Sequence, residues 1–194
     1  MEESDEILGK IDELRAQYYN QHEKKTFFKK KQKIECANSI AQNFDIHKLI
    51  QSTVFVIPNT SHVYFNYPLF KTYASPEIYS DTIAHTLNIL NNCIDNYGSF
   101  EMHVNLNTFS VSAMERYNDA IRLFCDECLK NQKEYYKKIT RMHLYHVPGI
   151  FDAISKILDL YINPVIKSKI IKYTKDDSEI VIKQLYELCN KIEK

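Results

Sequence analysis

The sequence carries no net charge, and this absence limits the partners that it can attract. Its 25 lysine and arginine residues are balanced by 25 aspartate and glutamate residues, so the formal charge at pH 7 is zero. Such a chain has no overall field that draws in nucleic acid or an acidic surface, and any contact of that kind would be local. We therefore expect no nucleic-acid partner.

Long apolar runs are missing as well. No stretch approaches the roughly 18 consecutive apolar residues that a membrane-spanning helix needs. The N-terminal stretch MEESDEILGK is acidic and does not contain the apolar segment of a signal peptide. These absences predict a soluble, cytoplasmic protein.

A disulfide framework is also absent. The five cysteines are scattered and odd in number, which predicts reduced thiols. Cys125 and Cys128 have the spacing of a redox or zinc motif, but they lie within a helical run from Met114 to Lys138. A zinc site would need a second ligand pair, and the seven histidines supply none at zinc-finger spacing. We expect neither a metal nor a cofactor.

The composition that remains is that of a globular protein. With 194 residues, of which 44% are hydrophobic and 26% charged, the chain can form one sizeable domain with a small helical extension. Apolar residues at helical spacing predict one helix over residues 4–22, with Ser4 as its N-cap, and another over about 26–44. We therefore divide the chain into a helical N-terminal region, residues 1–50, and a main domain, residues 51–194.

Strands and helices alternate along the main domain. Strands are predicted at 54–57, 62–67, 100–107, from 139 and from 170, and the main helices at 75–97, 112–138 and 149–162. This order predicts an α/β fold with a parallel or mixed β-sheet and flanking helices.

The segment from Ile139 to Tyr173 has the most informative pattern. It contains a short strand, a turn at residues 146–149, an amphipathic helix at 149–162 and a second strand. One side of that helix is broadly apolar, a pattern that an ordinary helix packed on a sheet would also show. The apolar face includes Ile150, Ile154, Ile157, Leu158 and Tyr161.

The order of these elements resembles the C-terminal half of a CRAL-TRIO domain, a family that includes phosphatidylinositol-transfer proteins. The resemblance implies a CRAL-TRIO-like sheet with a lipid pocket under a mobile gate helix, which would be the helix at 149–162. It also implies that this helix contacts an acyl chain of a bound lipid. The gate and acyl-chain residues would be Ile150, Phe151, Ile154, Ile157, Leu158 and Tyr161.

The same resemblance implies a site for the lipid headgroup. Lys169 and Arg141 match two cationic positions of the phosphatidylinositol-binding members, and Thr140 stands where those members have a glutamate. Arginine can bind two phosphate oxygens and lysine supplies a point charge, so both suit a phosphate.

The resulting hypothesis is a protein that binds a phospholipid, with phosphatidylinositol favoured, or a similar hydrophobic ligand. It would transfer or present this ligand between membranes through transient peripheral contact with them. A protein-interaction module without lipid transfer is the alternative, and a protein partner is compatible with both. An enzyme built on His103, His143 and His146 is a further alternative, but the sequence places no carboxylate or cysteine to form a relay with them. We therefore expect no catalytic activity.

Overall fold

The structure is a computed structural model that describes residues 2–22, 29–149, 151–158 and 161–190. Within this part of the chain, five strands form one mixed sheet, and their order in the sheet follows their order in the sequence. The strands are β1 (Val54–Val56), β2 (His62–Asn66), β3 (Phe100–Asn105), β4 (Ile139–Tyr145) and β5 (Ile170–Lys172).

The sheet combines one hairpin with a run of parallel strands. β1 pairs antiparallel with β2, and β2, β3, β4 and β5 then pair parallel, each with the next. Connections between parallel neighbours are almost always right-handed, so helices between successive strands lie on the same face of the sheet. One face is therefore covered by the helices of these connections, and the other is left for different elements.

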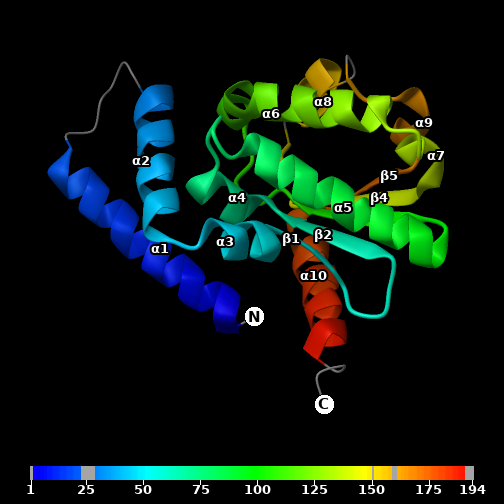
Figure 1. The fold of residues 1–194 in the computed structure, drawn as a ribbon, viewed down its shortest axis with the longest axis horizontal. Coiled ribbons are helices and arrows are strands. Elements are labelled where there is room, and N and C mark those ends of the chain that lie inside the picture. Colours follow the sequence, from blue (N-terminus) through cyan, green and yellow to red (C-terminus); the bar gives the residue numbers. More distant parts are fainter. Residues whose placement is uncertain (1, 23–28, 150, 159–160, 191–194) are drawn as a thin grey trace.

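The described helices surround this sheet. They are α1 (Glu2–Gln21), α2 (Lys29–Asn43), α3 (Ile46–Thr53), α4 (Tyr67–Tyr73), α5 (Tyr79–Tyr97), α6 (Val111–Lys130), α7 (Tyr135–Lys138), α8 (Phe151–Leu158), α9 (Pro164–Lys167) and α10 (Lys175–Asn190). Side chains of α5 to α9 gather over one face, where they line a cavity, and α10 packs on the opposite face. Figure 1 shows α5 and α6 running across the sheet and α10 extending away from it toward the C-terminus.

The N-terminal helices share a hydrophobic core with the main domain. Ile11 of α1 and Ile40 of α2 are fully buried in a cluster that also contains Phe70 of α4 and Tyr117 of α6. In Figure 1, α1 and α2 lie at one end of the molecule, and α7 and α9 lie at the other.

The predicted α/β class with a mixed sheet is confirmed, and all five strands lie where the sequence placed them. Several helix boundaries differ. Ser4 lies inside α1 and is not its N-cap, and α5 begins at Tyr79, after the predicted start at Ser75. The long helix predicted over 112–138 ends at Lys130, because the Asn131 side chain accepts a hydrogen bond from the Lys133 N–H and turns the chain.

Helices α3 and α4 were not predicted, and neither was the short helix α9. α4 follows β2 directly because Asn66 caps it, accepting a hydrogen bond from the Leu69 N–H, and because Pro68 stands in its first turn. α3 begins after Asp45, whose carboxylate accepts hydrogen bonds from the N–H groups of His47 and Lys48. Among the described helices, none combines the length and apolar character that crossing a bilayer requires.

Candidate functional site

The face of the sheet under α5 to α9 borders an apolar cavity of about 310 Å³. We call this side of the sheet the cavity face. Along β3, Phe100, Met102 and Val104 line the cavity, while the residues between them point to the opposite face, because side chains alternate along a strand. The floor of the cavity is completed by Phe65, Ile139, Met142, Leu144 and Ile170.

Helices supply the walls. α6 contributes Tyr117, Ile121 and Phe124, and its start is fixed by Ser110, whose hydroxyl oxygen accepts a hydrogen bond from the Ala113 N–H. The lining is thus almost wholly apolar, and it is drawn from several elements far apart in the sequence. Such a space is suited to an apolar molecule.

Polar lining groups come mainly from the α8–α9 segment. Ser155, Asn163 and Lys167 line the cavity there, and Lys167 is the cationic side chain among its described lining residues. Cys125 and Cys128 also line it, and burial raises the pKa of Cys125 to about 11 and that of Cys128 to about 12. Both thiols lie partly buried within helix α6, as the sequence predicted.

The predicted acyl-chain residues are divided by the structure. Phe151 and Tyr161 line the cavity, and Ile154 is fully buried in α8 without being part of the lining. Ile150 and the side chains of Ile157 and Leu158 lie outside the described residues. The helix itself is shorter than the predicted span of 149–162, since α8 ends at Leu158 and α9 begins at Pro164, capped by the Asn163 side chain.

The predicted headgroup residues do not gather at this cavity. The Lys169 ammonium donates hydrogen bonds to the carbonyl oxygens of Tyr136 and Ile139, and the Thr140 hydroxyl donates to the Phe100 carbonyl. Arg141 pairs in register with Glu101 and therefore points to the opposite face of the sheet. None of the three predicted residues is among the described residues that line the cavity.

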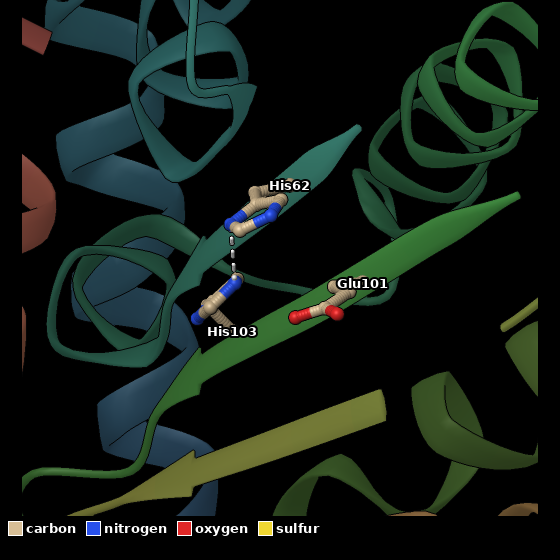
Figure 2. A group of neighbouring side chains, drawn as sticks. All are labelled: His62, Glu101 and His103. Atoms are coloured by element: carbon tan, nitrogen blue, oxygen red, sulfur yellow. Dashed lines mark hydrogen bonds between the residues drawn. The ribbon is translucent and has the colours of Figure 1, made fainter. Parts of the chain in front are cut away.

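The opposite face carries a cluster of histidines, and we call it the histidine face. The register places His62 of β2 beside Glu101 of β3, and His103 of β3 beside His143 of β4. The Nδ1 atom of His62 and the Nε2 atom of His103 are 3.2 Å apart, and the His103 and His143 rings stack with centroids 4.6 Å apart. Figure 2 shows that His62 and His103 point toward one another, with the Glu101 carboxylate beside them.

Tyrosines and a carboxylate hold the remaining ring nitrogens. Nδ1 of His103 is 2.8 Å from the hydroxyl of Tyr145, and Nδ1 of His143 is 2.9 Å from the hydroxyl of Tyr173. Nε2 of His143 lies 3.2 Å from a carboxylate oxygen of Glu101. The cluster thus contains two hydrogen-bonded chains, His62–His103–Tyr145 and Glu101–His143–Tyr173, which meet where the His103 and His143 rings stack.

Burial keeps the imidazoles of His103 and His143 neutral. It lowers the pKa of His103 to about 3, with the neighbouring His143 and His62 adding to the effect. Burial also lowers the pKa of His143, although the Glu101 carboxylate opposes that shift. Both rings therefore have a nitrogen lone pair available near neutral pH.

Sequence analysis did not identify two members of this cluster, Glu101 and His62. It grouped His103 with His143 and His146. The structure brings His103 and His143 together, whereas His146 lies beyond the end of β4 in a left-handed conformation with φ of 52°. Sequence analysis found no carboxylate near the histidines, and here the structure corrects it, because Glu101 lies beside His143. Only the register between neighbouring strands reveals Glu101 and His62, although the alternation of Glu101 with His103 along the strand was a usable signal.

Comparison with known proteins assigns no family. A scan against protein-family models found no match, and a search among curated proteins found none either. The function must therefore be argued from the cavity and the histidine cluster.

Proposed function

We propose that this protein binds a phospholipid or a similar hydrophobic ligand by enclosing its apolar chain in the cavity, and that it transfers or presents this ligand between membranes. The observation that carries the proposal is the cavity itself, which has a volume of about 310 Å³ and an almost wholly apolar lining. An apolar space of this size would exclude a charged or strongly polar substrate, because such a group would lose its hydration without gaining partners. The resemblance to CRAL-TRIO domains supports the same function.

The volume also restricts the ligand. Pockets for small molecules usually span about 300–1,000 Å³, so this cavity lies at the lower end of that range. It suits one apolar chain or a compact apolar molecule. A lipid with two long chains would need additional space, which an outward movement of α8 would provide.

A headgroup would lie nearest to the α8–α9 segment. Asn163 and Lys167 line the cavity there, and an ammonium group is a suitable partner for a phosphate oxygen. We therefore assign the phosphate-facing role to Lys167 in place of the trio Lys169, Arg141 and Thr140. A single ammonium group suits the phosphate of any phospholipid, so the preference for phosphatidylinositol rests on the resemblance to CRAL-TRIO domains alone.

Helix α8 is the element that would admit the ligand. Phe151 in its first turn and Ser155 in its second line the cavity, so displacing α8 opens the apolar lining. The exposed apolar surface would be stabilised in a membrane interface, which makes transient membrane contact part of the proposed cycle.

The first test is binding. Organic extraction of the purified protein followed by mass spectrometry should yield a bound lipid or fatty acid. Val104→Trp places a large side chain in the cavity and should reduce the bound ligand by at least about tenfold, because the ligand and the indole need the same space. Val165→Trp is the matched control, since Val165 is exposed on α9 and does not line the cavity.

A wild-type protein that is lipid-free and takes up no fluorescent fatty acid from solution would contradict the proposal. That outcome, together with normal thermal stability of Val104→Trp, would favour a protein-interaction module. Equal ligand binding by Val104→Trp and wild type would show that the ligand lies elsewhere.

The second test is transfer between vesicles. Lys167→Gln should slow transfer of phosphatidylinositol by about tenfold, the loss expected when one hydrogen bond to a charged group is removed. Arg141→Gln should leave transfer unchanged, because Arg141 lies on the histidine face. The reverse result would restore Arg141 to the headgroup site.

A further inference from the structure

We propose that His62, Glu101 and His103 form a binding site for a divalent transition-metal ion of the zinc type. The three residues converge on the histidine face, and one ligand atom from each lies within 4.8 Å of the other two. The site is separate from the cavity, because these side chains and the lining residues of β3 point to opposite faces of the sheet.

The spacing of the two histidine nitrogens fits a shared ion. A tetrahedral zinc ion with nitrogen ligands at about 2.0–2.1 Å holds two imidazole nitrogens about 3.3 Å apart. Nδ1 of His62 and Nε2 of His103 are 3.2 Å apart, and Figure 2 shows them facing one another. The ion would take the place of the proton between these two nitrogens, which leaves His62 protonated at Nε2, and the Glu101 carboxylate, now within 4.8 Å, would move closer to complete the site.

The outer partners orient the ligands as metal sites require. A metal-bound histidine commonly donates its other ring N–H to a second group, which fixes the tautomer. Nδ1 of His103 has such a partner in the hydroxyl of Tyr145, a fully buried residue, so Nε2 is the atom left for the metal. Glu101 is similarly held, because its carboxylate accepts a hydrogen bond from Nε2 of His143 at 3.2 Å.

The chemistry of the set favours zinc over magnesium or calcium. Two imidazoles and one carboxylate are typical zinc ligands, whereas magnesium and calcium prefer oxygen atoms. The single carboxylate would leave the ion with a net positive charge, and the exposed, solvated Arg141 beside Glu101 adds only a screened repulsion. His62 and Glu101 are only partly buried, so an ion can reach the site from solvent.

The test is isothermal titration of the chelator-treated full chain with zinc chloride. Wild type should bind one zinc ion, and both His62→Gln and Glu101→Gln should weaken the affinity by at least about tenfold, because each removes one ligand. Both substitutions are at partly buried positions and keep a polar side chain. His47→Gln is the matched control, since His47 is an exposed histidine of α3 outside the cluster.

A second measurement separates this site from adventitious binding and from unfolding. Cobalt chloride should give the visible absorption of a tetrahedral complex in wild type and in His47→Gln, but not in His62→Gln or Glu101→Gln, while circular dichroism confirms that all four proteins are folded. The proposal is overturned if wild type binds no zinc, or if the cluster variants bind zinc and cobalt as wild type does. In that case the histidines are hydrogen-bonded structural groups.

Tyr145→Phe tests the positioning of His103. Removing the hydroxyl that faces Nδ1 should weaken zinc binding by about tenfold to a hundredfold without removing a ligand. A folded Tyr145→Phe protein with unchanged zinc affinity would contradict the assigned roles of the His103 ring nitrogens.

Discussion

At the scale of single residues, the thiols of the cavity wall should be unreactive. Burial raises the pKa of Cys128 to about 12, with the nearby Cys125 and Glu127 adding to the shift. At neutral pH its thiolate fraction is then about a thousandfold lower than that of a free cysteine, and the thiolate is the reactive form. We predict that iodoacetamide labels Cys128 in the folded protein far more slowly than in urea, as measured by peptide mass spectrometry.

The pH dependence provides the control for this prediction. Because the pKa lies well above the labelling range, the rate in the folded protein should rise about tenfold per pH unit between pH 7 and pH 9. A rate equal to that of the urea-unfolded chain would mean that the thiol is exposed and that this cavity wall is wrongly placed.

His103 should make the fold sensitive to acid. Its pKa is lowered to about 3 in the folded state from 6.5 in the unfolded state, chiefly by burial. Below pH 6.5 the unfolded chain therefore takes up a proton that the folded chain does not, and the free energy of unfolding falls until about pH 3. The slope from this one group is at most about 1.4 kcal/mol per pH unit.

Urea denaturation at pH 6.5 and pH 5.5, in the presence of a chelator, measures this slope above the pH range in which most carboxylates titrate. The neighbouring His143, whose pKa is also lowered, should steepen this slope. The Glu101 carboxylate raises the pKa of His143 and so makes that contribution smaller. His103→Gln should reduce the slope, and His47→Gln should leave it unchanged. An equal slope in all three proteins would show that His103 is not buried as a neutral group.

Residue-level prediction from sequence succeeded where it depended on local pattern. The alternation of Met102 with Glu101 and His103 set the two faces of β3 correctly, because side-chain period in a strand is fixed by the backbone. It did not reveal that His62, Glu101 and His143 meet, because that depends on which residue of one strand lies beside which residue of the next. Likewise, only the fold shows that Lys169 binds carbonyl oxygens of the α7–β4 junction.

At the scale of elements, α10 is tied to β4 by one buried hydroxyl. Ser178 is fully buried, and its oxygen accepts a hydrogen bond of 2.7 Å from the His146 N–H at the end of the strand. Ser178→Ala would leave that N–H without its partner, which costs about 1–3 kcal/mol. Urea denaturation should show this loss, whereas Ser168→Ala, at an exposed position of the α9 end, should change stability by less than about 0.5 kcal/mol.

An unchanged stability in Ser178→Ala would mean that α10 is held by its apolar contacts alone. Those contacts join Leu185 of the helix to Tyr64 and Tyr145 on the histidine face.

Elements with a strong repeating pattern of apolar residues were predicted from the sequence, and elements without one were not. The strands and the amphipathic helices α5 and α6 have strong repeating patterns, and the structure has them near the predicted places. α3 and α4 are short, and their existence depends on the caps Asp45 and Asn66, which are easily read as loop residues.

At the scale of the whole molecule, the N-terminal helices and the sheet should unfold together. Ile11 of α1 is fully buried in the cluster shared with α4 and α6. Ile11→Ala should therefore lower the global free energy of unfolding by about 2–5 kcal/mol, because it leaves a cavity in a common core. Circular dichroism and tyrosine fluorescence should report the same shifted transition, and Asp12→Ala, at the exposed neighbouring position, should behave as wild type.

Two separate transitions, with only part of the helical signal lost early, would contradict this expectation. They would instead support the division of the chain at residue 50 that the sequence suggested.

The sequential order of the strands has a consequence for biosynthesis. Each parallel strand pairs with the strand that precedes it, so a chain emerging from the ribosome can add one strand and its helix at a time. When β4 has emerged, most of the cavity floor and the α5 and α6 walls are in place, while α8, α9 and β5 are still to come. The proposed apolar ligand would therefore meet an open cavity while the protein is being made, before the last wall closes over it.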